Sequence, residues 1–405
     1  MRILFLSQLF DPENAIKGAS FIRALQALGH EIEVVTTFPS YPGGKIYDGY
    51  HQSWREFEDL AGVRVVRVPS FISHESSAMK RVLSYTSFVL SAAWYSLVSA
   101  KKADVIYAYY PPVLVGLTAM ILGWVKRIPY VYDVQDLWPE ALVATGHLSK
   151  NSKGIFWIDW VCGLIYKKAA RIVVLSQGYR TLLISKGVSP EKVVCIYNWC
   201  DETRLQFEGP MPVIWRDIPG KFRVLYAGNF GSAQSLSHVI GAAEILHQSG
   251  DRQIQIVFLG SGVNLDALRA QAIGLPNLTF IPPVKVDEVG QYLSAADVLL
   301  IHLAKNQVFD NTIPQKTQAY LMAGKPILMA VGGEAADLVL RAQAGIVVTP
   351  ENSLAMAEAL RMLARMPRAQ LEIMGKNGYD FYKKTMSMSH GVQAIERLLQ
   401  EVTKS

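Results

Sequence analysis

A lysine lies near the start of an expected helix in the stretch IPQKTQAYLMAGKP, residues 313–326. Pro314 suits the first turn of that helix, and the Gly-Lys-Pro that follows would end it. The N-terminal end of a helix carries free N–H groups and the positive end of the helix dipole, so it favours an anion and disfavours a cation. A diphosphate would make the charge of Lys316 favourable there, whereas a solvated lysine is the alternative. The neighbours that could add hydrogen bonds are Gln315, Thr317 and Gln318.

Glycine-bearing turns follow expected strands in the second half of the chain. The first turn contains Gly228, Asn229, Phe230 and Gly231, and the second contains Gly260 and Gly262. Glycine lets backbone N–H groups approach a phosphate closely, so we expect both turns to contact a nucleotide. Gly18 occupies a similar place in the first half, where a tight turn explains it equally well. The G-x-G-x-x-G motif is incomplete in these turns, which argues against a nicotinamide cofactor.

The sequence contains no pattern typical of a metal site. There is no D-x-D tripeptide, no pair of histidines at helical spacing and no cysteine cluster. We therefore expect no metal cofactor, and the charge of Lys316 together with helix N-termini could stabilise a leaving group instead.

Composition limits the classes of protein that fit. A chain of 405 residues, of which 50% are hydrophobic and 18% charged, predicts two folded domains. The net charge of +6 favours an anionic partner, but no long basic run indicates nucleic acid. Three widely spaced cysteines predict no disulfide framework and fit a reducing cytosol. The apolar N-terminus breaks at Asp11-Pro12 without a cleavage signal, so it predicts a first strand.

Short apolar runs alternate with helical patterns along the whole chain. This alternation predicts an α/β fold in which parallel sheets are covered by helices on both faces. We expect two doubly wound, Rossmann-like sheets that face a crevice, with ligands beyond the carboxyl ends of the strands. The expected domains are 1–200 and 201–385, followed by a C-terminal helix at 386–405 that could cross back to the first domain. The runs read as strands are RILFLS, EIEVVTT, VRVVRV, DVIYAYY, PYVYDV, RIVVLS and VVCIYN, then FRVLYAG, QIQIVFLG, LTFIPPV, DVLLIHL, PILMAV and GIVVTP.

Several stretches resemble the retaining glycosyltransferases of family 4, which have the GT-B fold. YAGNFGSAQSL, VFLGSG, DVLLIHL and AGKPILMAVGGEAADLV are similar in order and spacing to the donor domain of that family. DVQDLWPEALVATG, residues 133–146, with VLSQGYRTLLISKGVSPEKVVCIYNWCDE resembles its WbuB-like branch, which builds bacterial O-antigens, capsules and exopolysaccharides.

The resemblance implies a reaction. A sugar would move with retention from a UDP- or GDP-sugar donor to a polyprenyl-diphosphate-linked saccharide. The enzyme would lie in the cytoplasm, peripherally at the inner face of the bacterial plasma membrane, where it would contact anionic lipid.

The resemblance also implies which residues act. Lys316, Asp136 and Glu334 would be catalytic. Gly333 and Asp337 would lie with Glu334 against the donor sugar or leaving phosphate, although Glu334 and Asp337 could equally cap a helix. Most relatives have two glutamates where this chain has Asn311 and Ala319, and a His-Asp pair where it has Gln135-Asp136. Lys316 would then take over charge neutralisation, and Gln135 the sugar contact of the histidine.

Two alternatives to the transferase hypothesis stay open. One is a non-hydrolysing nucleotide-sugar epimerase, which would need acidic and histidine groups that the expected crevice strands rarely offer. The other is a catalytically silent sugar-nucleotide-binding partner, because the family glutamates are missing.

Two aromatic segments raise the question of membrane contact. Residues 80–102 predict a sheet-covering helix that is either plain core or has an exposed side touching the membrane. Residues 155–172 place Trp157, Trp160 and Leu164 on one helical face, which buried packing would explain.

Overall fold

The computed structural model describes residues 1–41, 43–72, 78–109, 113–140, 142 and 152–404. The chain divides into two compact units, which are described separately. The first unit comprises Met1–Tyr197 and Gly391–Ser405, and the second comprises Asn198–His390. Residues 141 and 143–146 of the DVQDLWPEALVATG motif lie outside the described part.

Within its described residues, the first unit is built on an eight-stranded sheet in the order β3-β4-β2-β1-β5-β6-β7-β8. All neighbouring strands are parallel except β3 and β4. The elements are β1 (Arg2–Leu6), α1 (Ala19–Ala27), β2 (Glu31–Thr37), β3 (Glu56–Leu60), β4 (Val63–Val68), α2 (Ala78–Val98), β5 (Val105–Tyr109), α3 (Val115–Lys126), β6 (Tyr130–Val134), α5 (Lys153–Lys168), β7 (Arg171–Val174), α6 (Gln177–Ser185), the 3₁₀ turn η1 (Pro190–Lys192), β8 (Val193–Cys195) and α16 (Met388–Lys404).

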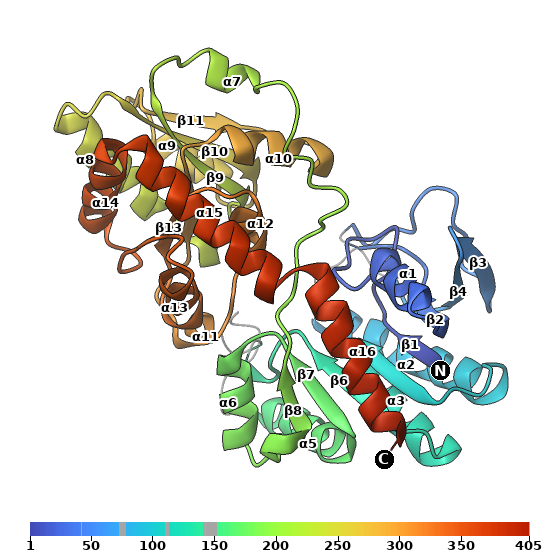
Figure 1. Ribbon diagram of the computed structural model, residues 1–405. Coiled ribbons are helices and arrows are strands. Elements are labelled where there is room, and N and C mark those ends of the chain that lie inside the picture. The colour runs from blue at the N-terminus through green and yellow to red at the C-terminus, as the bar shows by residue number, and fades with distance from the viewer. Residues whose placement is uncertain (42, 73–77, 110–112, 141, 143–151, 405) are drawn as a thin grey trace. The chain divides into compact units, whose positions relative to one another are not determined.

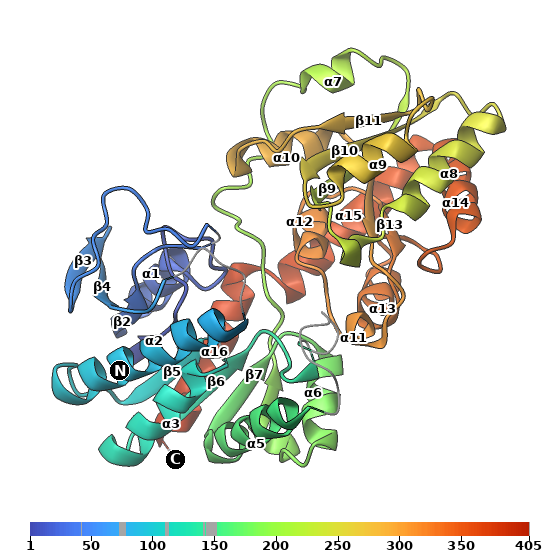
Figure 2. The same cartoon turned by 180° about the vertical axis from the view of Figure 1, so that it is seen from behind.

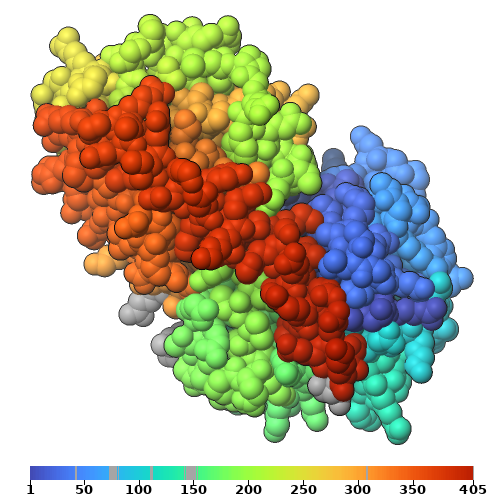
Figure 3. Space-filling view, viewed as in Figure 1, coloured from blue at the N-terminus to red at the C-terminus, as the bar shows by residue number. Residues whose placement is uncertain are grey.

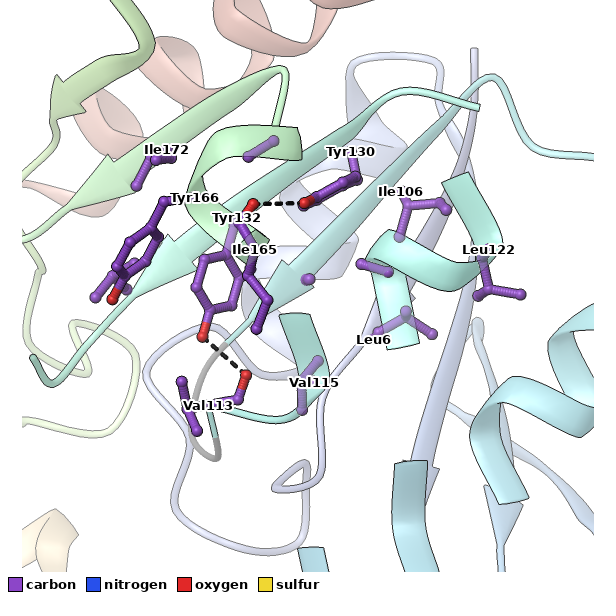
Figure 4. Packing of buried hydrophobic residues seen from close by; sticks show 14 of the residues in the cluster. Leu6, Ile106, Val113, Val115, Leu122, Tyr130, Tyr132, Ile165, Tyr166 and Ile172 are labelled. Carbon is purple, nitrogen blue, oxygen red and sulfur yellow. Dashed lines mark hydrogen bonds between the residues drawn. The ribbon is translucent and has the colours of Figure 1, made fainter. Parts of the chain in front are cut away.

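Helices α2, α3 and α5 cover one face of this sheet (Figure 2). Their buried side chains form one core with inward residues of β1, β5, β6 and β7. Two tyrosine hydroxyls inside that core are satisfied by backbone carbonyls, because Tyr130 donates to Ile165 and Tyr132 donates to Val113 (Figure 4). The sheet is therefore buried on this face, as a near-continuous apolar strand pattern requires.

The opposite face carries α1 and α16 (Figure 1). Helix α16 is amphipathic, and its buried side chains include Ile395, Leu398 and Leu399. From Gly391 onward it belongs to the first unit, on whose surface it lies in Figure 3. The last segment of the chain thus helps to bury a sheet whose strands come from the first half of the sequence.

Strand β3 was not predicted from the sequence. It pairs antiparallel with β4 at the edge of the sheet, through a tight turn in which Ala61 and Gly62 have φ of 52° and 86°. The run EFEDL is rich in charge and none of its residues is fully buried, so it lacks the apolar pattern of the other strands. Charged edge strands of this kind also discourage pairing with another chain.

The second unit has a six-stranded parallel sheet in the order β11-β10-β9-β12-β13-β14 within the described residues. Helices α8, α9 and α14 bury one face, and α15 lies on the other, where it packs with α12 (Figures 1 and 2). The elements are α7 (Val213–Arg216), β9 (Phe222–Asn229), η2 (Ser232–Gln234), α8 (Ser237–Gln248), β10 (Ile254–Ser261), α9 (Leu265–Gln271), β11 (Leu278–Ile281), α10 (Val286–Ala295), β12 (Val298–His302), α11 (Gln307–Asp310), α12 (Lys316–Met322), β13 (Ile327–Ala330), α13 (Gly333–Arg341), β14 (Gly345–Val347), α14 (Ser353–Arg365) and α15 (Arg368–Thr385). Two parallel α/β sheets confirm the predicted fold class.

Candidate functional site

The centre of the site in the second unit is the contact between Lys316 and the carboxyl end of β9. The Lys316 Nζ lies 3.6 Å from the centroid of the Tyr226 ring. A Cβ built on Gly228 would lie 2.9 Å from the same nitrogen, so the absence of a side chain at Gly228 admits the amine. Strand β9 ends beside this amine, at the edge of a parallel sheet where ligands usually bind.

Lys316 is buried at its charged end. Its Nζ is buried and has no hydrogen-bond acceptor among the described residues, although the residue as a whole is only half-buried. Burial lowers the pKa of Lys316 from 10.5 to about 7. The Tyr226 ring offers a cation–π contact, but no carboxylate in the described part of the chain pairs with the amine. A buried ammonium of this kind is costly unless an anion joins it.

The helix in the opening stretch begins later than its sequence predicts. Helix α12 starts at Lys316 itself, and Pro314 precedes it by two residues. The Gln318 amide nitrogen donates to the carbonyls of Pro314 and Gln315, at 3.0 and 2.8 Å. Gln318 and Thr317 are both buried, whereas Gln315 is exposed. Of the three expected donors, Gln318 is therefore used in holding the turn, and Gln315 is the one open to solvent.

The two glycine-bearing turns pack directly on each other. A Cβ on Gly260 would lie 1.9 Å from the Gly228 carbonyl oxygen, and one on Gly262 would lie 2.6 Å from backbone atoms of Phe230. Backbone bonds join the turns, since Phe230 N donates to Ser261 O at 2.8 Å and Asn264 N donates to Phe230 O at 3.0 Å. Packing thus accounts for Gly260 and Gly262, while Gly228 faces the lysine.

Residues around the first turn have different surroundings. The Phe230 side chain, expected to contact the donor, is fully buried among the rings of Tyr226, Phe258 and Phe280, so its role is in the core. Gly231 N donates to the Gln234 Oε1 at 3.0 Å, and the exposed Asn229 amide lies 3.5 Å from the same oxygen. Asn229 is therefore the side chain of this turn that remains accessible to a ligand.

His302 was missed by the sequence analysis. Its ring is fully buried, with Nδ1 at 2.8 Å from the Gln234 carbonyl and Nε2 accepting from Glu351 N at 3.0 Å. Burial lowers the pKa of His302 to about 4, so the ring is neutral near pH 7 and Nδ1 carries the proton. The histidine connects η2 to the loop before α14 and thereby supports the glycine turn. A lone histidine at a strand end gave no distinctive signal.

The turn before α13 lies against α11. Cβ atoms built on Gly332 and Gly333 would lie 2.4 and 2.0 Å from atoms of Asp310, and Gly333 has a φ of 61°. Glu334 is in the first helical turn and half-buried, and Asp337 is exposed. The glycine pair is explained by this close approach to Asp310, which the sequence analysis did not identify.

A buried charged cluster lies at the carboxyl ends of β5 and β6 in the first unit. Asp133 accepts hydrogen bonds from Lys17 and the Tyr107 hydroxyl on one oxygen, and from Gln135 Nε2 at 2.6 Å on the other. Lys17 and Asp133 are fully buried. Burial and the neighbouring Asp133 carboxylate hold the pKa of Tyr107 well above its usual value. Gln135 is thus directed at Asp133, and the cluster of Lys17, Tyr107 and Asp133 is one that sequence reasoning did not combine.

Two predicted site residues are close in sequence to this cluster. Asp136 lies three positions after Asp133, and Gly18 directly follows Lys17. Asp136 follows β6 and has an exposed side chain, although the protein that surrounds it raises the pKa of its carboxyl. Asp11 Oδ2 accepts from Ala19 N at 2.7 Å, and a Cβ on Gly18 would lie 2.1 Å from that oxygen. The protein's own carboxylate therefore occupies the start of α1, and this approach explains Gly18 without a phosphate.

The part of the chain that the structure describes contains no cluster of three or more His, Cys, Asp or Glu side chains suited to a metal ion. Both oxygens of Asp133 are already engaged by its neighbours.

Two family models match consecutive parts of the chain. Residues 19–199 match the Glycosyl transferase 4-like domain, and residues 221–366 match Glycosyl transferases group 1. The first match lies in the first unit except for its last two residues, and the second match falls within the second unit.

Relatives and solved structures agree with these matches. The chain is 26% identical over 386 residues to the putative colanic acid biosynthesis glycosyl transferase WcaI of Escherichia coli, covering 91% of this chain and 93% of WcaI. It is 24% identical over 319 residues to the probable glycosyltransferase WbjE of Pseudomonas aeruginosa, covering 75% and 76%. Anabaena HepE in complex with UDP has a similar fold, with a TM-score of 0.72 at 17% identity over 99% of this chain and 100% of HepE. Sucrose-phosphate synthase from Thermosynechococcus elongatus gives 0.71 at 17% identity, over 99% and 98%.

Proposed function

Because the chain belongs to the family 4 glycosyltransferases of the GT-B fold, we propose that it transfers a sugar with retention from a UDP- or GDP-sugar to a lipid-linked saccharide. WcaI is named for colanic acid biosynthesis, which supports a role in a bacterial surface polysaccharide. HepE was solved with UDP and with UDP-glucose, which favours a uridine nucleotide as the first donor to test. A lipid-linked acceptor would place the enzyme peripherally at the inner face of the plasma membrane.

The observation that carries the donor proposal is the Lys316 amine. It is buried against Tyr226, it has no acceptor among the described residues, and it lies against the bare backbone of Gly228 at the end of β9. The negative diphosphate of a nucleotide sugar would supply the missing partner. The exposed Asn229 and Gln315 side chains would add hydrogen bonds at the same end of the sheet.

The proposed reaction breaks the bond between the anomeric carbon and the diphosphate oxygen. The acceptor hydroxyl oxygen forms the new bond on the same face, and its proton passes to the departing diphosphate. Lys316 neutralises the charge that accumulates on that leaving group, which is where fixed electrostatic stabilisation has its largest effect. Asp136 and Glu334 are proposed to contact the sugar, and Gly333 and Asp337 to adjoin it from α13.

The proposal needs no metal. The lysine charge would stabilise the leaving group in place of a cation, so transfer should continue after chelation with EDTA. If EDTA abolished transfer and manganese restored it, the role given to Lys316 would be wrong, and the exposed carboxylate of Asp136 would be the first ligand to examine.

One experiment separates the proposal from the epimerase and the silent binding partner. The protein is incubated with radiolabelled UDP- and GDP-sugars and bacterial membrane lipids, and the products are separated by extraction. Label in the lipid fraction supports transfer, a free epimerised donor supports the epimerase, and donor binding without either product supports the silent partner.

A further inference from the structure

Helices α2, α3 and α5 expose an unusual amount of aromatic and aliphatic surface. Trp124, at the end of α3, is 83% exposed, and Phe156 and Trp157 of α5 are 76% and 64% exposed. The Trp160 ring lies 6.1 Å from the Trp157 ring and is also exposed. This corrects the expectation that buried packing accounts for the tryptophans of 155–172.

Helix α2 continues the same pattern. Its buried side, which includes Phe88 and Tyr95, packs into the core, while Leu90, Trp94 and Val98 are exposed at intervals of four residues. Residues four apart are neighbours on a helix, so they form a continuous apolar row. The three helices cover one face of the sheet, so their exposed sides face away from it (Figure 2). We call this the α2-α3-α5 surface.

The charged residues of α2, α3 and α5 are almost all basic. The three helices contain six basic residues and one acidic residue, Asp159. Exposed Lys167 and Lys168 end α5, and exposed Arg127 follows α3. A second copy of the same surface would repel this charge, whereas anionic lipid headgroups would attract it.

A groove on this surface has the chemistry of a lipid site. It encloses about 440 Å³ and is lined by Met120, Ile121, Trp124, Ile128, Pro129 and Lys168. Most of the residues that line the groove are apolar, and Lys168 adds one cationic side chain. An acyl chain below a phosphate headgroup presents the matching combination.

We propose that the α2-α3-α5 surface docks the protein onto an anionic membrane. Tryptophan rings at the headgroup level and lysines against anionic phosphates are the groups that hold interfacial helices in a bilayer surface. None of the helices among the described residues is long and apolar enough to cross a membrane. The inference rests on the proposed function, which requires the acceptor to be in a lipid bilayer, and it assigns the contact to particular side chains.

Vesicle cosedimentation tests the apolar half of the surface. The wild-type protein should bind vesicles of phosphatidylglycerol and phosphatidylcholine in equal parts more tightly than pure phosphatidylcholine. The variant Trp124→Ser/Trp157→Ser/Trp160→Ser should bind the mixed vesicles at least about tenfold more weakly, because three exposed rings no longer enter the interface. Trp54→Ser is the matched control, since Trp54 is 59% exposed in the same unit but outside these helices, and it should bind as wild type.

A second variant tests the charge. Lys167→Gln/Lys168→Gln should weaken binding to the mixed vesicles by roughly twenty-five-fold, about fivefold for each lysine, and reduce its salt dependence. Lys383→Gln/Lys384→Gln removes an equally exposed pair at the end of α15 and should have no effect. Equal melting temperatures would show that none of these surface changes unfolds the protein.

Binding of UDP-glucose, measured on the same samples, separates this inference from the proposed function. Loss of vesicle binding with unchanged UDP-glucose affinity supports the docking surface. Vesicle binding that is absent in the wild type, or unaltered in both surface variants, overturns it even if transfer occurs. Light scattering could instead show that the wild type is a dimer and the tryptophan variant a monomer. If neither protein bound vesicles, the surface would bind a second copy of the chain, and the membrane proposal would also be overturned. Tryptophan-dependent vesicle binding by a protein that binds neither UDP-glucose nor, in a parallel measurement, any other UDP- or GDP-sugar would leave the surface intact and refute the transferase proposal.

Discussion

Lys316 is the residue on which the donor site depends. Its nitrogen is buried, has no partner in the described part of the chain and lies 3.6 Å from the Tyr226 ring centroid. In the protein without a ligand, the charged form of this lysine is therefore unfavourable. The sequence singled out this lysine because a cation at a helix start is unfavourable without an anion. It did not indicate Tyr226 or the burial of Nζ, since both depend on where β9 and α12 meet in the sheet.

Replacing Lys316 tests its role in turnover. Lys316→Ala should lower kcat by on the order of a hundredfold while changing donor affinity less, because the leaving diphosphate carries its greatest charge in the transition state. Lys316→Arg should retain part of the activity, since a planar guanidinium does not fit the place of a compact ammonium. Lys305→Ala, an exposed lysine on the same unit, serves as control in steady-state kinetics. Turnover that Lys316→Ala leaves intact would mean that the lysine is structural.

The same variant should also change stability in a pH-dependent way. The folded-state pKa of Lys316 is lowered to about 7, against 10.5 in the unfolded chain, so burial opposes its charged form. Below pH 7 the folded protein bears the full cost of burying the protonated amine. Its free energy of unfolding should therefore rise as the pH increases from 7 towards 10.5. Lys316→Ala should therefore melt higher than wild type at pH 6, with an advantage that shrinks by pH 10. If the melting temperature of Lys316→Ala exceeded that of wild type by more as the pH rose, the burial of the Lys316 amine would be contradicted.

At the scale of elements, the sequence predicted the positions of the strands better than the packing of the turns and helices around them. Each apolar run read as a strand forms one, because burial on both faces of a parallel sheet demands a continuous apolar sequence. The charged edge strand β3 has no such pattern and was missed. The tryptophans of α5 were wrongly assigned to the core. Their spacing shows that they share one face of the helix, but it does not show whether another element covers that face. Gly260 and Gly262 suggested a phosphate loop, but their mutual approach to Gly228 and Phe230 could be seen only in the folded sheet.

Gly260→Ala tests the packing of the two turns. Its Cβ would meet the Gly228 carbonyl oxygen at 1.9 Å, and its φ of 146° is unfavourable for alanine. We expect a loss of several kcal/mol of stability, about 2–4, from displacement of the β9 turn and backbone strain. Thermal denaturation measures the effect. At Gly163 in α5 a Cβ would meet nothing within 4 Å, so Gly163→Ala should stabilise slightly. A Gly260→Ala protein as stable as wild type would show that the turns do not constrain each other.

At the scale of the molecule, the Lys316 site lies in the second unit and the α2-α3-α5 surface lies in the first. Each unit has its own sheet and core, so ligand effects on backbone exchange can be assigned to one unit or the other. UDP should slow hydrogen exchange at residues 227–231 and 312–318 of the second unit, because a ligand restrains the backbone it contacts. Mass spectrometry of peptides with and without UDP would measure this. Protection confined to residues before 198 would show that the nucleotide binds the first unit, and would contradict the site proposed at Lys316.

The most direct test of the central claim counts the protons that accompany donor binding. UDP-glucose has no ionisation near neutral pH, so a proton taken up on binding must come to a protein group. If the diphosphate pairs with Lys316, whose pKa in the free protein is about 7, binding at pH 8 should take up roughly nine-tenths of a proton, and at pH 6 about one-tenth. Isothermal titration calorimetry in buffers of different ionisation enthalpy gives this number, and Lys316→Met should abolish it. Binding of UDP-glucose at pH 8 without proton uptake, or with the same uptake in Lys316→Met, would contradict the claim that this lysine meets the donor diphosphate.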